Sequence, residues 1–230
     1  MARILQALDG ERLLAARCLF GGGTAIALAY GEFRESRDID FLVSDLDGYR
    51  RLRQDLTGVA GLAAITRPGA RLHALREVRA DQYGVRTLVA ADAGNDAGIK
   101  FEIVLEGRIV IEPPRAQDLI CGVATLTPLD MATSKLLANA DRWRDDSVLS
   151  RDIIDLAMMR PGRDLLRRAL AKARGAYGDS VEEALLKAIE NLRAQPHRLD
   201  HCMQAMGIGT VPKAVLWARI KALAPRRRKQ

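Results

Sequence analysis

All of the clear β-strand patterns in this chain precede Pro113-Pro114, and this placement constrains the fold more than any other feature. Strand patterns are short apolar or alternating runs bounded by turn residues. They occur at 38–43, 85–89 and 99–105, with shorter candidates at Ile65 and 108–111. No strand pattern recurs after the two prolines, so the first half of the chain is expected to supply the sheet.

The other periodic segments predict helices, most of them beyond the prolines. They lie at 3–17, 24–30, 46–56, 115–123, 129–141, 151–159, 163–174, 180–193 and 211–223, with a turn at 92–98. The sequence therefore predicts an α/β (α+β) protein, with an α/β domain over residues 1–114 and a helical domain over residues 115–230.

The distribution of charge points to a polyanionic partner. Residues 1–140 contain 17 Lys/Arg and 18 Asp/Glu, whereas residues 141–230 contain 19 and 11. The net charge of +7 is therefore concentrated in the C-terminal part. Such asymmetry favours a partner such as RNA, DNA or nucleotide phosphates, and a solvated basic helical surface is the equally weighted alternative. No apolar run is long enough to span a bilayer, so we expect a soluble cytoplasmic protein without a membrane partner.

Asp38 and Asp40 are the first candidates for chemistry. They lie two residues apart on a predicted strand, so both side chains should share one face of the sheet. Two carboxylates on one face of a core strand are costly unless a cation lies between them. Magnesium is a usual solution, and two such ions can assist nucleotidyl transfer. Taken alone, an Asp-x-Asp pair more often consists of solvated turn residues.

The run Gly21-Gly22-Gly23-Thr24 follows a short apolar stretch and opens a predicted helix. Backbone without Cβ atoms can approach a triphosphate closely, and a helix N-terminus favours anions. Thr24 can donate to a phosphate oxygen or cap the helix. A glycine-rich turn with an ordinary cap is the alternative interpretation, and the run is not a Walker-type loop.

Glu102 is the candidate for a third carboxylate. It lies in the strand pattern at 99–105 with apolar neighbours, where an acid requires a partner. A metal shared with Asp38 and Asp40 would supply one. An ion pair with Lys100, on the same face of the strand, is the less favoured alternative.

Four segments together resemble a known family. They are Leu19–Ala25, Arg34–Phe41, Lys135–Arg142 and Arg151–Leu156. In this order they resemble the AbiEii/AbiGii-type nucleotidyltransferases, which include the MenT-like toxins of type IV toxin–antitoxin systems and belong to the DNA polymerase β-like superfamily. The resemblance spans about residues 19–156.

The resemblance implies a nucleotidyltransferase fold with a mixed sheet, followed by a C-terminal helical bundle. It implies a Mg²⁺-dependent enzyme, with two ions and Mn²⁺ as the alternative metal, that moves an NMP from an NTP to RNA. A tRNA 3′ end is the expected acceptor and a cognate antitoxin the expected protein partner. The same chemistry on a protein or small-molecule hydroxyl, and a non-catalytic nucleotide-binding protein, are the rival hypotheses.

The resemblance also assigns site residues. It places Gly22, Gly23 and Thr24 on the triphosphate, and Asp38, Asp40 and Glu102 on the metal. It adds Lys135 and Arg142 as phosphate contacts and Asp152 as a positioning group or base, and it implies that Arg34 and Ser36 brace the phosphate loop.

The helical segments leave two assignments open. Lys135 and Arg142 are seven residues apart and so share a helix face, but Arg144 is an alternative to Arg142 as the motif arginine. Asp152 and Asp155 both lie near a helix start, where interaction with the helix dipole is an alternative to a functional role. A functional role is favoured for Asp152 and left even for Asp155.

Overall fold

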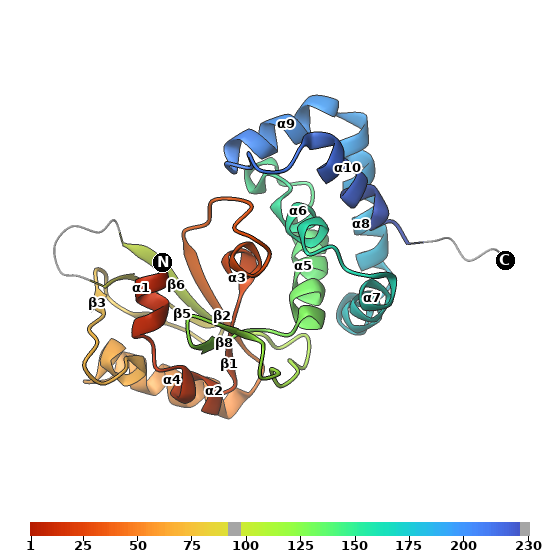
Figure 1. The fold of residues 1–230 in the computed structure, drawn as a ribbon. Helices are drawn as coiled ribbons and strands as arrows, with labels where there is room; N and C mark the ends of the chain where they lie inside the picture. The colour runs from red at the N-terminus through yellow and green to blue at the C-terminus, as the bar shows by residue number, and fades with distance from the viewer. Residues whose placement is uncertain (92–97, 226–230) are drawn as a thin grey trace. The chain divides into compact units, whose positions relative to one another are not determined.

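The computed structural model describes residues 1–91 and 98–225 (Figure 1). The chain forms two compact units. Met1–Ala25 and Arg37–Thr127 make up the first, here called the sheet unit, and Ile26–Ser36 and Pro128–Gln230 make up the second, the helical unit. A domain division at residue 114 stays a prediction; the fold groups residues 115–127 with the sheet and residues 26–36 with the helices.

The sheet unit is built on a mixed sheet, as expected, with strand order β1-β2-β6-β5-β3 and β4 paired to β5. Among the strand pairs of this sheet in the described residues, β2 and β6 run parallel to each other and the others are antiparallel. The predictions for 38–43 and 99–105 are confirmed at both ends, and 85–89 lies within β5. The strands are β1 (Cys18–Gly21), β2 (Asp38–Val43), β3 (His73–Ala74), β4 (Arg79–Ala80), β5 (Gly84–Ala90) and β6 (Ile99–Leu105).

One face of this sheet forms an apolar core. Phe20, Phe41 and Phe101 come from three adjacent strands, and neighbouring ring centroids lie 5.6 Å apart in tilted pairs. All three side chains are buried. Aromatic rings contribute large buried areas and favour such tilted packing. The core therefore fixes the register of β1, β2 and β6, and this register places their polar residues on the opposite face.

The helices of the sheet unit are α1 (Ala2–Ala7), α2 (Gly10–Ala15), α4 (Leu46–Thr57) and the 3₁₀ helix η1 (Gly61–Ile65). The single helix predicted over 3–17 is wrong, because the chain is extended at Leu8 and Asp9 caps a new helix by accepting from the Arg12 N–H. An aspartate at the N-cap satisfies a donor that would otherwise have no partner.

Three further predictions in this unit are wrong. Ile65 ends η1 rather than lying in a strand, and 108–111 contains no strand. The helix predicted at 115–123 is a hairpin of β7 (Leu119–Ile120) and β8 (Val123–Ala124). Its two turn residues have φ of 50° and 79°, which is typical of a type I′ turn. The predicted turn at 92–98 lies outside the described residues except for Gly98.

The helical unit packs α5 against α6, α7 and α8. The five helices predicted beyond residue 128 are all present. A sixth, α9, was missed although Pro196 at its first turn is a start signal. None of the helices within the described ranges is long and apolar enough to cross a membrane. The helices are α5 (Pro128–Arg142), α6 (Arg151–Met158), α7 (Arg163–Tyr177), α8 (Ser180–Ala194), α9 (Pro196–Ala205) and α10 (Lys213–Ala222).

Candidate active site

Strand β2 presents two aspartates on the polar face of the sheet. Asp38 and Asp40 are half-buried and alternate with Ile39, Phe41 and Val43, which are fully buried. This alternation is the pattern expected of a strand with one face in the core. The predicted placement of the two carboxylates on one face is therefore what the structure has.

Glu102 lies in the same row of the sheet as Asp40. Asp40 is in register with Gly21 of β1 and with Glu102 of β6, and Glu102 is in register with Arg86 of β5. Two carboxylates directly opposite each other destabilise a sheet. Glu102 accepts from Arg86 Nε at 3.0 Å and from Lys100 Nζ at 2.8 Å, which offsets that repulsion. The ion pair with Lys100, the alternative considered above, is thus present, and a metal-binding role for Glu102 stays a prediction.

Gly22 brings the backbone directly against the Asp40 carboxylate. It has φ +67°, and a Cβ atom added there would lie 2.4 Å from Asp40 Oδ2. Helix α3 (Gly22–Ala29) begins at this residue, so its first N–H groups lie beside Asp40. Thr24, in the first turn of α3, is buried. The glycine is required here for both the backbone conformation and the close approach.

Replacing Gly22 with alanine is expected to reduce the nucleotide transfer that the resemblance implies by about 10²-fold or more while the chain still folds, because the new methyl group must displace the Asp40 carboxylate. Gly61→Ala is the matched control. Gly61 also has positive φ, +52°, but a Cβ there would meet nothing within 4 Å. Transfer assays and thermal unfolding of both variants separate displacement of Asp40 from backbone strain. Equal activities in the two variants would contradict the assigned contact.

The donor set of this face fits a magnesium ion that is shared with substrate. Mg²⁺ is usually bound through one or two carboxylates together with waters and substrate phosphates. Asp38 and Asp40 meet that requirement with oxygen ligands alone. No group of three or more His, Cys, Asp or Glu in residues 1–91 and 98–225 is arranged to hold a metal. Metal binding by Asp38 and Asp40 stays a prediction.

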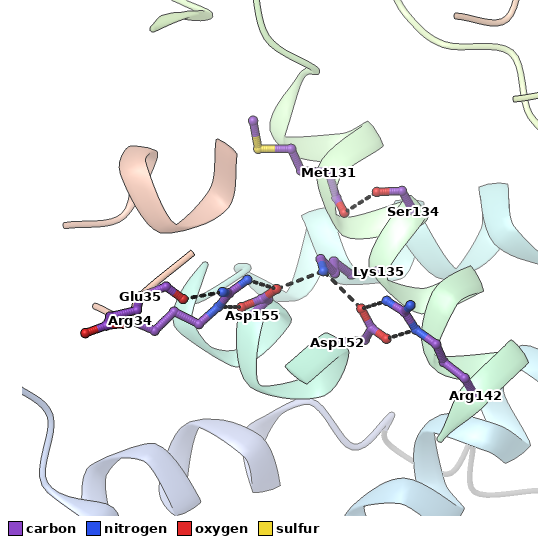
Figure 2. A network of polar contacts seen from close by, with 8 residues as sticks. All are labelled: Arg34, Glu35, Met131, Ser134, Lys135, Arg142, Asp152 and Asp155. Carbon is purple, nitrogen blue, oxygen red and sulfur yellow. Dashed lines mark hydrogen bonds and ion pairs between the residues drawn. The ribbon is translucent and has the colours of Figure 1, made fainter. Parts of the chain in front are cut away.

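The helical unit contains a second charged cluster, a chain of five alternating charges that is buried except at Arg142 (Figure 2). Arg34 Nε lies 2.7 Å from Asp155 Oδ1, and Asp155 Oδ2 lies 2.8 Å from Lys135 Nζ. Lys135 Nζ lies 3.0 Å from Asp152 Oδ1, and Arg142 Nε lies 2.7 Å from Asp152 Oδ2. The cluster therefore ties the loop before β2 to α5 and α6.

Burial and ion pairing shift the pKa values of Asp152 and Lys135 in opposite directions. Burial alone would raise the pKa of Asp152, but the charges of Lys135 and Arg142 outweigh it and lower the pKa to about 2. Burial likewise opposes the charged form of Lys135, but Asp155 and Asp152 raise its pKa. Both groups are therefore held in their charged forms.

This geometry argues against one predicted role of Asp152. A general base works best when its pKa is near the operating pH. Asp152 is almost fully buried, and both of its oxygens accept from cations, so its carboxylate is a poor proton acceptor. Lys135 is also buried and bonded to two aspartates. A positioning role for Asp152, and phosphate contact by Lys135, stay predictions.

The structure groups the predicted site residues into two sets. The sheet unit contains Gly22, Gly23, Thr24, Asp38, Asp40 and Glu102, and the helical unit contains Arg34, Ser36, Lys135, Arg142 and Asp152. Within the second set Arg142 pairs with Asp152, and its predicted contact with phosphate stays a prediction. Arg144 instead lies over the ring of Trp143, 4.9 Å from its centroid.

Asp155 is the residue whose role the sequence interpretation left undecided. It is completely buried and accepts from Arg34 through two nitrogens, at 2.7 and 3.0 Å. Its spacing of three from Asp152 places both acids on one side of α6. This spacing of two acids, together with Lys135 on a neighbouring helix, was the signal in the sequence from which a buried network could have been predicted.

Comparisons with known proteins identify the family of the chain. The family model described as "Nucleotidyl transferase AbiEii toxin, Type IV TA system" matches residues 3–221. No curated protein matches the chain. Two crystal structures from H. pylori, a candidate nucleotidyltransferase and JHP933, each have a TM-score of 0.46 and 17% identity. Each alignment covers 94% of this chain, with 90% of the first and 87% of the second.

The family match includes both units of the chain and all four segments that carried the resemblance. Type IV systems pair a toxin with an antitoxin, so this match also identifies the class of protein partner, and the transferase activity identifies a nucleotide as substrate. The chain belongs to the AbiEii family of nucleotidyltransferase toxins of type IV toxin–antitoxin systems, and it is a nucleotidyltransferase.

Proposed function

We propose that this enzyme transfers a nucleoside monophosphate from an NTP to a hydroxyl group of RNA in a Mg²⁺-dependent reaction, with a tRNA 3′ end as acceptor. Addition of nucleotides to tRNA would stop translation in the cytoplasm, which suits a toxin that its antitoxin neutralises. The acceptor oxygen would attack the α-phosphorus, and pyrophosphate would leave.

The observation that carries this proposal is the contact between the Gly22 backbone and Asp40. It places the start of α3 beside a carboxylate on the polar face of the sheet, with Asp38 two residues away on the same strand. A helix N-terminus attracts phosphate, and paired carboxylates attract a divalent cation. An NTP complexed with magnesium presents both of these groups together.

Each residue of this face has a defined task in the proposal. Asp38 and Asp40 would hold Mg²⁺, and the backbone of Gly22 and Gly23 would receive the phosphates. Bound magnesium would neutralise charge that develops on the transferred phosphate and on the leaving pyrophosphate. Glu102 pairs with Lys100 and Arg86, and as the predicted third carboxylate it would face the metal from the neighbouring strand.

The acceptor class draws support from charge. Of the +7 net charge, the excess of Lys and Arg over Asp and Glu lies in residues 141–230. Such a surface binds polyanions without sequence preference. A protein or small-molecule acceptor would not need it.

The test is incubation of the purified chain with each of the four NTPs, labelled on the α-phosphate, in the presence of total tRNA, unfolded protein or an aminoglycoside. The proposal predicts label on tRNA with one NTP preferred. Label on protein or on the aminoglycoside would show that the acceptor belongs to a different class, although the transfer reaction would be the one proposed. Nucleotide binding without pyrophosphate release would instead favour a non-catalytic protein.

A further inference from the structure

A pocket with a basic lining lies in the sheet unit, in the segment that joins η1 to β3. Its volume is about 360 Å³, and it is lined by residues 63 and 66–73. This is within the range of small-ligand pockets. Three of its lining side chains are Arg67, Arg71 and His73. None of them belongs to the carboxylate face described above.

Arg67 is held in a fixed orientation at this pocket. Its Nε donates to the Leu8 carbonyl at 2.7 Å, and its Nη2 donates to the Gly122 carbonyl at 3.3 Å. Among the described residues no carboxylate pairs with Arg67, Arg71 or His73. Carbonyl groups orient a guanidinium without neutralising it. The pocket therefore retains positive charge and a preorganised donor, which lowers the entropic cost of binding an anion.

The backbone of the pocket adds further donors. Pro68-Gly69 forms the centre of a turn in which the Ala70 N–H donates to the Arg67 carbonyl at 3.1 Å, with φ +83° at Gly69. Proline followed by glycine with positive φ is typical of a type II turn. The backbone N–H groups of Gly69 and Arg71 donate no hydrogen bond within the described residues. Such free N–H groups in a turn are suited to anions.

Position in the sheet relates this pocket to the proposed reaction. His73 pairs with Ala90 at the end of the sheet where β2 begins with Asp38. Strands β5 and β6 lie between β3 and β2. Three strand spacings correspond to about 14 Å. A strand of RNA can span this distance within a few nucleotides.

The charge of the same segment favours a polymer over a single phosphate. Residues 67–80 contain four arginines and one acid, Glu77. Arg71, Arg76 and Arg79 are exposed. A free phosphate would need only the pocket, whereas further exposed arginines along the same segment are suited to successive phosphates of one strand.

We propose that the pocket formed by Arg67, Arg71 and His73 binds a backbone phosphate of the RNA acceptor. The phosphate-binding character follows from the pocket alone, and the identification of the polymer as the acceptor rests on the proposed function. The site holds the acceptor strand a few nucleotides away from the hydroxyl that reacts.

The test measures RNA binding without NTP, so that no turnover is needed. Arg71→Gln with His73→Gln removes one cation and one imidazole and leaves the anchored Arg67 in place. Binding of a fluorescent single-stranded RNA of about 12 nucleotides is followed by anisotropy at several salt concentrations. We expect affinity to fall by about tenfold, and the slope of log affinity against log salt to shrink by about 0.7 for each RNA phosphate that the variant no longer neutralises.

Arg17→Gln is the matched control, because Arg17 is an exposed arginine of the same unit near the other end of the sheet. It should bind RNA as the wild type does, and ATP affinity should be equal in all three proteins. Unchanged RNA affinity and slope in the double variant would overturn the inference, as would a loss of ATP affinity with RNA binding intact. A wild-type chain that binds no RNA would contradict the acceptor class itself.

Discussion

Replacing Asp40 with asparagine is expected to lower the rate of nucleotide transfer by about 10³-fold or more. The amide keeps the shape of the side chain and its packing against Gly22 but removes the negative charge. A magnesium ion bound by two carboxylates then loses half of the protein charge that holds it, and charge stabilisation in such sites commonly accounts for this magnitude. Transfer of α-labelled NTP to tRNA measures the effect.

Asp47→Asn is the matched control for this experiment. Asp47 is an exposed aspartate of the same unit whose contact is an ion pair with Arg50 on the surface. We expect unchanged transfer, because an exposed pair of this kind contributes little. Raising the Mg²⁺ concentration should partly restore the Asp40 variant if the defect is in metal binding. Wild-type activity in that variant would remove Asp40 from the reaction.

Replacing Asp155 with alanine is expected to destabilise the helical unit by about 3–5 kcal/mol. Asp155 is completely buried and is bonded to both Arg34 and Lys135. Its removal leaves two cations facing each other with reduced compensation, which costs far more than the pair contributes when intact. Chemical denaturation of the full chain measures the change in the free energy of unfolding.

The two tryptophans of the chain make this measurement specific to the helical unit. Trp143 and Trp217 both lie in it, so their fluorescence reports its unfolding. Asp164→Ala is the matched control, because Asp164 forms an exposed pair with Arg167 and should cost at most about 1 kcal/mol. Equal effects of the two substitutions would show that the buried chain of charges does not stabilise the unit.

Much of the sheet could be predicted because its strands have one buried face. In β2 the alternation of acids with Ile39, Phe41 and Val43 determines both the bounds of the strand and the face that carries the carboxylates. The hairpin at 119–124 could not be recognised in the same way. Its strands are two residues long, which is too short for a periodic pattern, and its turn depends on positive φ at Cys121 as well as Gly122.

The residue types of the site could be predicted from the sequence better than the contacts that these residues make. Glu102 was expected to need a partner, and it has two cations, of which Arg86 comes from a strand sixteen residues away in sequence. Strand pairing decides such a contact, and a single sequence does not reveal which strands pair. For the same reason Arg34 and Asp155, which are 121 residues apart, could not be assigned to each other.

We propose that the Gly22–Asp40 face catalyses nucleotidyl transfer to tRNA. The most direct test supplies the wild-type enzyme with tRNA, Mg²⁺ and the preferred NTP labelled on either the α- or the γ-phosphate. We expect the α-label to become attached to tRNA and the γ-label to be released in pyrophosphate. Attachment of the γ-label, or release of pyrophosphate without attachment of the α-label to tRNA, would contradict it.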